Sequence, residues 1–499
     1  MSDNPGNLSL HQRLRFLAKD SILYGGAASF NKAFALLTFP VLARYLSVEL
    51  YGFFDFLNVG VGLLAIIMVF GQDSAVARFF YDHKQDRPRQ EIISQSLVFQ
   101  FTLLVLVLLP LWFLANRVTT LIGKPGVSDW LVRLILLNVP FLVLINFSQN
   151  ILKWTFSRTK FLIISIGSTV FTIGALLIGL IWFQFGLNEL FSLFLVSRAL
   201  FGLLGLWFCR QWLIWPEDWR FLKPLIYFAL PYGIICTVSA FIPALERTFV
   251  VKYLDARDLG LFGAGAKIAV LISLPIQAFQ VAWGPFSLAI HMEQNAHVTY
   301  NHALKVFTLS IVLLVMALTT VAEPVIQFLA SSQYAGASIV VFPLAMGFAL
   351  QGLSAIVSVG INLSKKSYVN LVSYAVYLLV SVVAIYSLID GFGLLGVAWG
   401  SLFGRLAMSI TESCMSWRVY PLPWAFARIT ACLIFVFAWC ATGQGVTLQA
   451  GIIQGIIFNV IGLAILIPFG LLTLFSQQER EQIRKWAVNQ LGCKQRAVR

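Results

Sequence analysis

Long apolar stretches follow one another along almost the whole chain, and short connections separate them. A membrane-spanning helix needs about 20 mostly apolar residues. On this criterion we predict an all-α polytopic membrane protein with fourteen transmembrane helices, at 20–46, 52–78, 92–115, 130–153, 161–183, 187–209, 224–250, 260–290, 303–330, 336–363, 368–389, 392–417, 424–442 and 451–475. The short connections leave no room for a soluble catalytic domain between these helices.

The composition excludes the soluble and the disordered classes of protein. Hydrophobic residues make up 59% of the chain and charged residues only 11%. The 43 Phe, 14 Trp and 14 Tyr residues supply more apolar surface than a solvated chain can expose. The six cysteines are scattered without a C-x-x-C pair, so we expect small buried side chains and neither disulfides nor a metal site.

The positions of Lys and Arg predict the orientation of the chain, because cytoplasmic connections retain an excess of them. One set of alternate connections contains only Arg44, Arg117, Lys124, Lys252 and Arg257, whereas the other set and the two ends contain most of the rest. We therefore predict that both termini are cytoplasmic. Membrane topology explains the net charge of +14, so we expect no nucleic-acid partner. The N-terminal stretch shows no convincing signal-peptide cleavage site.

A motif recurs at an offset of 208 residues. Residues 44–54, which begin Arg-Tyr-Leu-Ser, match residues 252–262, which begin Lys-Tyr-Leu-Asp, and each copy suits a tight turn between two helices. The repeat predicts an N-terminal lobe (20–210), a cytoplasmic linker (211–223), a C-terminal lobe (224–418) and two appended helices (419–476). Residues 1–19 and the basic tail 477–499 are predicted to be cytoplasmic, the tail either lying on the membrane surface or frayed. Repeated halves are typical of alternating-access transporters, with the substrate site between the halves.

These motifs resemble a known family. Residues 44–54, the run from Glu246 to Ile268 and the stretch 392–398 are similar to the polysaccharide-transporter flippases of the multidrug/oligosaccharidyl-lipid/polysaccharide exporter superfamily. The resemblance covers essentially the whole chain. It implies two six-helix lobes around a central cavity, a bacterial inner-membrane location, and transport of polyprenyl-diphosphate-linked oligosaccharide to the outer leaflet for surface polysaccharide such as O-antigen. Polysaccharide assembly proteins are the partners that this resemblance implies.

Basic residues inside predicted helices are the strongest candidates for the substrate site. A charge at membrane depth costs at least about 2.5 to 3.5 kcal/mol, so such side chains usually face a bundle interior or an aqueous cavity. Cations there would bind the diphosphate of a lipid-linked sugar without any covalent step. Arg133 lies near a helix end, where its side chain can reach the interface, and is set aside. The predicted substrate-binding residues are Lys32, Arg247, Lys267, Arg198 and Arg405.

Four acidic residues also lie within predicted helices: Asp55, Asp73, Glu246 and Glu412. They are candidates for binding Na⁺ or H⁺ and coupling transport to an ion gradient. Pairing with the cations, or capping of helix ends, explains them equally well. Asp73 lies beside Arg78 and favours the structural role, and the coupling ion stays open.

Two other patterns are decoys. Residues 391–396 fit the dinucleotide-binding pattern G-x-G-x-x-G, but a helix-length apolar run precedes them, so we predict a short outer turn between helices. His291, His297 and His302 lack the spacing and the acidic partners of a metal site. We expect no catalytic residue, no metal and no cofactor.

Two rival functions remain open at this point. A cation-coupled multidrug exporter of the same superfamily is disfavoured by fourteen helices where twelve are typical, and by intramembrane charges that suit an anionic cargo. A membrane-embedded polyprenyl-linked glycosyltransferase or polymerase is disfavoured by the short connections. A peptidoglycan precursor is a further candidate cargo.

Overall fold

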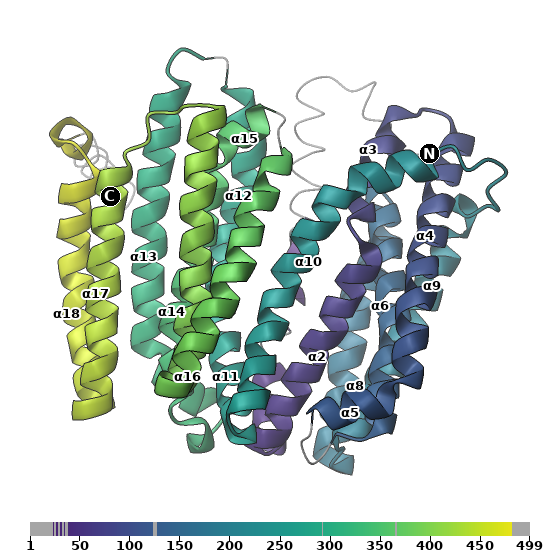
Figure 1. Cartoon of the computed structure of the whole chain (residues 1–499), viewed down its shortest axis with the longest axis horizontal. Coiled ribbons are helices and arrows are strands. Elements are labelled where there is room, and N and C mark those ends of the chain that lie inside the picture. Colours follow the sequence, from purple (N-terminus) through teal and green to yellow (C-terminus); the bar gives the residue numbers. More distant parts are fainter. Residues whose placement is uncertain are drawn as a thin grey trace, which may run out of the picture.

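The computed structural model describes residues 23, 26, 27, 30, 31, 34, 38–122, 127–291, 293–364 and 367–481, and these form a bundle of helices (Figure 1). Twelve helical segments among them are long and apolar enough to cross a membrane. They are α2 with α3 (Val48–Val69, Gln72–Asp82), α4 (Asp86–Phe113), α6 (Asp129–Trp154), α7 with α8 (Arg158–Leu162, Ser168–Phe183), α9 (Leu187–Cys209), α10 (Leu222–Tyr253), α11 with α12 (Ala256–Ala269, Ser273–Ala289), α13 (Ala296–Leu329), α14 (Val341–Val357), α16 (Asn370–Val419), α17 (Phe426–Ala450) and α18 (Ile452–Leu474). In the predicted first span, 20–46, residues 20–22, 24, 25, 28, 29, 32, 33 and 35–37 lie outside the described residues.

One of these segments, α16, is a hairpin of two spans. Its 50 residues would extend well over twice the thickness of a bilayer core if the helix were straight. The backbone instead reverses at Gly393, where φ is 54°. The second arm then packs tightly on the first, because Cβ atoms added to Gly396, Gly400 or Gly404 would overlap Leu388, Ile385 and Ser381. The predicted turn at 391–396 and the predicted boundary between two helices are therefore confirmed.

The two copies of the repeated motif begin equivalent helices and pack against each other. Ser47 caps α2 by accepting a hydrogen bond from the Leu50 backbone N–H, and Asp255 and Asp258 form a capping box at the start of α11. A Cβ atom added to Gly52 would lie 2.5 Å from the backbone nitrogen of Gly260. Gly260 stands 208 residues after Gly52, so corresponding glycines of the two copies meet where α2 crosses α11.

Further contacts join the two halves of the repeat at the end of the bundle where these helix caps lie. We call it the outer end, because the distribution of Lys and Arg predicts that it faces away from the cytoplasm. Arg44 donates hydrogen bonds to the carbonyl oxygens of Phe328 (2.9 Å) and Leu329 (3.2 Å), the last residues of α13. The rings of Tyr51 and Tyr334 pack edge to face, with centroids 5.8 Å apart. The halves are thus in close contact at this end.

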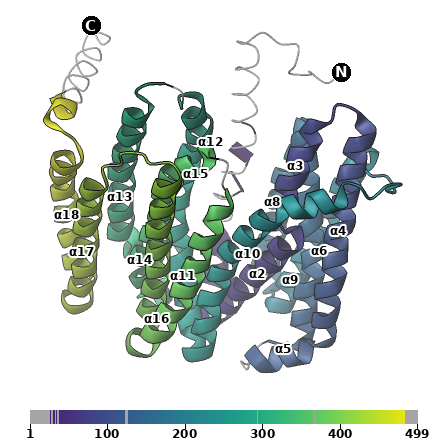
Figure 2. The same cartoon turned by 45° about the horizontal axis from the view of Figure 1, so that its top comes forward.

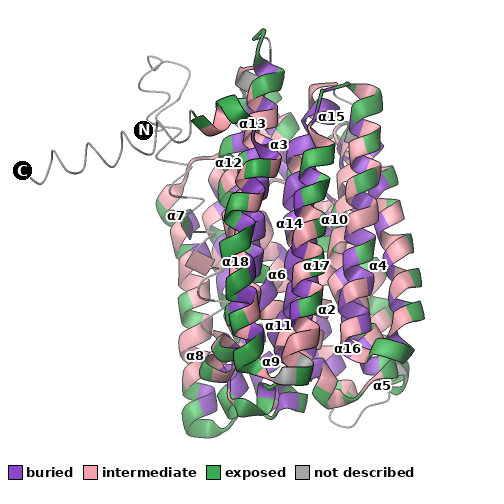
Figure 3. Cartoon of the chain, turned by 90° about the vertical axis from the view of Figure 1, so that its left-hand side faces the viewer, coloured by how far each residue is buried: buried purple, intermediate pink, exposed green. Residues whose placement is uncertain are grey.

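The remaining helices flank this junction. In Figures 1 and 2, α3 to α9 lie on one side, α11 to α16 on the other, and α17 and α18 at the margin beside α13. Among the twelve spans, the α14 segment has the largest share of buried residues in its apolar stretch. In the apolar stretches of α17 and α18 most residues are exposed or only partly buried, and Figure 3 shows this exposure. Part of the predicted linker packs on α4, where Arg87 contacts Glu217 and Gln95 donates to the Asp218 carbonyl. The lobe boundaries inferred from the repeat stay predictions.

Candidate functional site: a polar cavity beside the junction of the halves

Asp55 lies at the junction of the halves and binds two of the predicted cations. This α2 residue is almost fully buried, since its side chain is 3% exposed. One carboxylate oxygen lies 2.7 Å from Nε of Arg247 on α10, and the other lies 3.5 Å from Nζ of Lys267 on α11. Gly263 makes room for the group, because a Cβ atom there would lie 3.0 Å from Oδ2 of Asp55. For Asp55, pairing with cations, one of the alternatives left open by the sequence, therefore occurs between halves of the chain.

The polar contacts continue from Arg247 into the C-terminal half. Arg247 also donates to the Pro243 carbonyl oxygen at 2.9 Å, and its guanidinium lies 3.9 Å from Glu246. Glu246 accepts a hydrogen bond from Ser401 on the second arm of α16. A polar network therefore runs from the partly exposed Lys267 through the buried Asp55, Arg247 and Glu246 to α16.

Arg405 is held within the C-terminal half. Its Nε donates to the Tyr377 hydroxyl at 2.9 Å, and a terminal nitrogen donates to the Leu344 carbonyl oxygen at 3.2 Å. The guanidinium also stacks on Phe348, 4.3 Å from the ring centroid. Gly347 admits this side chain, since a Cβ atom there would approach it to 2.7 Å.

Arg198 has a different environment, in the N-terminal half. Its guanidinium donates to the amide oxygens of Asn138 on α6 (3.0 Å) and Asn58 on α2 (3.3 Å). Both acceptors are neutral, and no carboxylate within the described part of the chain lies at ion-pair distance. A partly buried guanidinium without a carboxylate partner is an attractive site for an anion.

Arg198 and Lys267 line the same cavity, which has a volume of about 290 Å³. Side chains with hydroxyl or amide groups surround it, together with the aromatic rings of Phe39, Tyr51, Phe54 and Phe194. The Tyr51 hydroxyl is buried and has no hydrogen-bond partner among the described residues. The polar lining residues are Asn31, Thr38, Tyr51, Asn58, Ser168, Thr169, Thr172, Ser197, Arg198 and Lys267.

The structure therefore revises the predicted arrangement of a cationic chamber between the lobes. Residues before α2, and α2, α6, α8 and α9, enclose most of the cavity, and Lys267 is the only described lining residue from the C-terminal half. Arg247 and Arg405 do not line it, because Asp55 and Tyr377 hold their side chains in the protein interior. Lys32 lies outside the described residues. The roles of all five cations in binding substrate stay predictions.

The other predicted residues lie apart from this cavity. Asp73 is exposed in the first turn of α3, where its carboxylate accepts from the Ser74 backbone N–H at 2.8 Å. The Arg133 guanidinium lies 5.7 Å from the Trp112 ring centroid. Glu412 is buried in the second arm of α16. The described residues contain no group of three or more His, Cys, Asp or Glu side chains able to hold a metal ion.

Several residues of the site were missed by sequence reasoning. Asn58 and Asn138 orient Arg198, and Tyr51 contributes a hydroxyl. A signal was present, because polar amides inside apolar spans usually bind a partner helix. A search restricted to ionisable groups passes over them.

Comparisons with known proteins agree with this architecture. A Haemophilus influenzae protein named "Lsg locus putative protein 1" is 22% identical over 330 residues, which are 64% of this chain and 78% of that protein. The solved structure of the lipid II flippase MurJ in an inward closed conformation has a TM-score of 0.68 at 15% identity, covering 90% of this chain and 99% of MurJ. An inward-facing multidrug resistance MATE family transporter of the MOP superfamily has a TM-score of 0.65 at 17% identity, covering 80% and 95%.

These likenesses show that the fold is one used by membrane transporters and flippases. The sequence profile of the polysaccharide biosynthesis protein family matches residues 41–339, which is more than half of the chain. The chain therefore belongs to the polysaccharide biosynthesis protein family and has the fold of the MurJ and MATE transporters.

Proposed function

We propose that this protein is a flippase that moves polyprenyl-diphosphate-linked oligosaccharide from the inner to the outer leaflet of a bacterial inner membrane. The obstacle to spontaneous flipping is the transfer of a diphosphate and a polar glycan through hydrocarbon. A polar cavity with fixed cations offsets that cost, while the lipid tail stays among the acyl chains. The transported unit would then serve surface polysaccharide assembly.

The observation that carries the proposal is the uncompensated charge of Arg198 inside the polar cavity. Asn58 and Asn138 orient the guanidinium but leave its charge available to phosphate oxygens. Lys267 adds a second cation, whose side chain is one-third exposed and which shares Asp55 with Arg247. Hydroxyl groups and aromatic rings in the same lining suit a sugar.

The size of the cavity supports a cycle of opening and closing. A volume of about 290 Å³ is at the lower limit for pockets that bind small molecules, and is too small for an oligosaccharide. Transport of a whole glycan therefore requires the halves to move apart, as in alternating access.

The test uses the purified protein in liposomes with a fluorescent polyprenyl-diphosphate trisaccharide as the probe. We expect Arg198→Gln to slow probe translocation by about ten-fold or more, since a hydrogen bond to a charged group contributes about 1.5 to 3 kcal/mol. Arg133→Gln is the matched control and should transport at the rate of the unmodified protein. Undiminished translocation by Arg198→Gln would overturn the assigned site. Export of a cationic dye without movement of the probe would favour the multidrug exporter, and glycosidic bond formation would favour the enzyme.

A further inference from the structure

Five acidic side chains within the described residues are buried, and four of them have basic groups or N–H donors close by. Asp55 contacts Arg247 and Lys267, and Glu246 lies near Arg247. Glu91 lies between Arg87 and Arg220, and Glu323 accepts from the Gln327 amide and the Gly336 backbone N–H. The fifth, Glu412, differs from all of these.

Glu412 has neither a cation nor an N–H donor among its described contacts. Its side chain is on the second arm of α16, the residue is 6% exposed, and its Oε2 atom is buried with no hydrogen-bond partner in the described part of the chain. The hydroxyl of Ser358, at the end of α14, is the polar group that reaches its carboxyl. A carboxylate in this position would carry a buried charge with little compensation.

The burial of Glu412 favours a protonated carboxyl group. The Ser358 hydroxyl lies 3.3 Å from the Ala355 carbonyl oxygen and can serve either neighbour, because a hydroxyl both donates and accepts. The neutral acid avoids the cost of burying an unpaired charge.

The elements packed around Glu412 contribute few titratable groups. The first arm of α16 contributes Tyr374, and α10 contributes Cys236, which lies close to Tyr374. On its own arm, the nearest described cation towards the outer end is Arg405, which is held by Tyr377 and Leu344. Lys365 and Lys366 lie outside the described residues. Within the described part of the chain, Glu412 is therefore a buried carboxyl group without a counter-charge, and binding a proton removes the cost of that charge.

We propose that Glu412 is a proton-binding site that couples transport to a proton gradient. Uptake forms an O–H bond between the carboxylate and H⁺, and release reverses that step, so no other reactant is needed. The helices around Glu412 are α10, α14 and both arms of α16, and all of them belong to the C-terminal half. A change in the packing of these helices would therefore change the access of water to the Glu412 carboxyl group. The coupling role rests on the proposed flippase function, whereas proton binding does not.

A proton fits the site better than a sodium ion does. A metal cation needs several oxygen ligands around it, whereas the described contacts place only two hydroxyl groups, those of Ser358 and Tyr374, near Glu412. The amide of Glu412→Gln has nearly the same shape but cannot bind a proton, so this variant tests the chemistry with little change in packing.

The first experiment detects the proton directly and does not depend on any cargo. Infrared difference spectra of the protein in liposomes are recorded between about pH 6 and about pH 9, where ordinary carboxyl groups stay ionised. We expect a carboxylic acid C=O band that titrates in the unmodified protein and in the control Glu323→Gln, and that disappears in Glu412→Gln. A band that survives in Glu412→Gln would overturn the proposal.

The second experiment measures coupling. Translocation of the fluorescent polyprenyl-diphosphate trisaccharide is followed with and without a pH gradient, and separately with a sodium gradient at equal pH. We expect the pH gradient to accelerate the unmodified protein, and Glu412→Gln to move the probe at a rate that no longer changes with the gradient. Two outcomes would overturn the coupling role. One is acceleration of probe translocation by the sodium gradient alone, and the other is an undiminished response of Glu412→Gln to the pH gradient. Failure of the unmodified protein to move the probe would refute the flippase function, while the infrared band still decides proton binding.

Discussion

At the scale of single residues, the buried ion pair between Asp55 and Arg247 is the interaction most sensitive to substitution. Oδ2 of Asp55 lies 2.7 Å from Nε of Arg247, and both side chains are nearly inaccessible to solvent. Replacing Asp55 with Asn leaves Arg247 buried without its main counter-charge. Loss of one partner of such a pair typically costs about 3 to 5 kcal/mol.

We therefore expect Asp55→Asn to lower the unfolding temperature of the protein in detergent, and the double variant Asp55→Asn/Arg247→Met to recover part of the loss. Thermal unfolding followed by circular dichroism measures both. Asp73→Asn is the control, because Asp73 is exposed at a helix start. Equal destabilisation in the single and double variants would show that the charge of Arg247 is not the cause.

The sequence identified Asp55, Arg247 and Lys267 as intramembrane charges, but not which of them pair. The cost of placing a charge inside the membrane marks each such residue separately and says nothing about its partner. Asp55 and Arg247 stand 192 positions apart, so only the packing of α2 on α10 brings them together. The same limit explains why the sequence could not tell that Arg198 lines the polar cavity and that Arg405 binds Tyr377 instead.

At the scale of elements, length and apolarity predicted the spans well, because both follow from the thickness of the bilayer. The turn at Gly393 and the caps at Ser47 and Asp255 were predictable from local chemistry. The break between α2 and α3 was not. Its backbone has positive φ at Phe70 (45°) as well as at Gly71 (69°), and an apolar residue such as Phe70 gives no local signal of a break.

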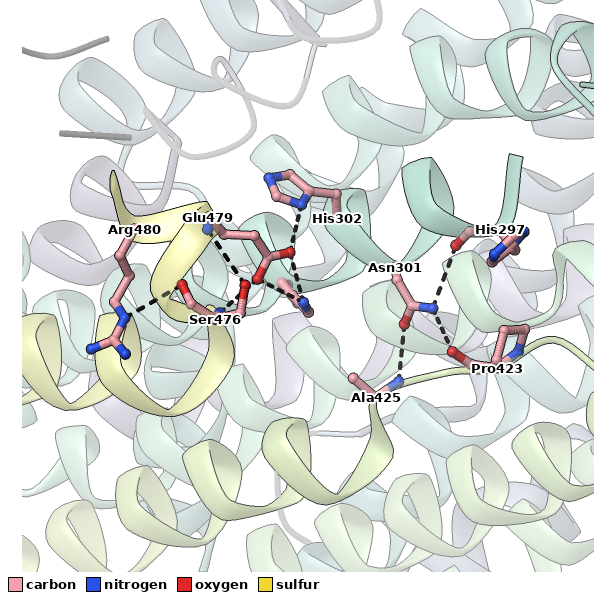
Figure 4. Close-up of polar contacts among 9 residues, drawn as sticks. His297, Asn301, His302, Pro423, Ala425, Ser476, Glu479 and Arg480 are labelled. Atoms are coloured by element: carbon pink, nitrogen blue, oxygen red, sulfur yellow. Dashed lines mark hydrogen bonds and ion pairs between the residues drawn. The ribbon is translucent and has the colours of Figure 1, made fainter. Parts of the chain in front are cut away.

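The segment that follows α18 is anchored by Glu479, as Figure 4 shows. Lys305 of α13 donates to its two carboxylate oxygens at 2.9 and 3.0 Å, and the Ser476 backbone N–H donates at 2.7 Å. Partial burial raises the pKa of Glu479, but the hydrogen bonds from Lys305 and Ser476 outweigh it and lower the pKa to about 2. Since an unanchored glutamate titrates near 4.5, the stabilisation is complete above that pH and is lost as the pH falls towards 2.

A spin label attached at Gln478→Cys should report this anchoring. We expect low mobility at neutral pH and increasing mobility as the pH falls below about 4.5. Glu479→Gln should make the label mobile already at neutral pH, whereas Glu481→Gln should behave like the unmodified protein. A label that stays immobile in Glu479→Gln would show that other contacts hold the segment.

At the scale of the whole molecule, the motif repeat predicted which helices correspond, and the profile match and the likeness to MurJ and MATE transporters agree with a transporter fold. The position of the cavity was not predictable. Hydropathy gives the depth of a residue in the membrane but not the direction of its side chain around the helix. Arg198 and Arg405 illustrate this, because both are intramembrane arginines and only Arg198 lines the cavity.

The contacts at the outer end should decide how often the cavity opens to that side. Arg44 crosses from one half to the other and binds the last carbonyl groups of α13, and it is joined there by the Tyr51–Tyr334 contact. Arg44 is exposed, so we assign its hydrogen bonds about 1 kcal/mol, which corresponds to about a five-fold change in the open population.

The test places a cysteine in the cavity with Asn58→Cys and adds a membrane-impermeant maleimide from outside, with the protein lacking Asn58→Cys as the background. We expect slow labelling in the otherwise unmodified protein, and labelling about five-fold faster when Arg44→Gln is added. Arg117→Gln is the matched control, because Arg117 is an exposed arginine of α5 (Ala115–Ile122) at the same end. If Arg44→Gln and Arg117→Gln label equally, the interaction of Arg44 with α13 does not hold the halves together. Faster labelling with Arg44→Gln alone would instead show that a hydrogen-bonded contact between the repeated halves limits access from the outer side.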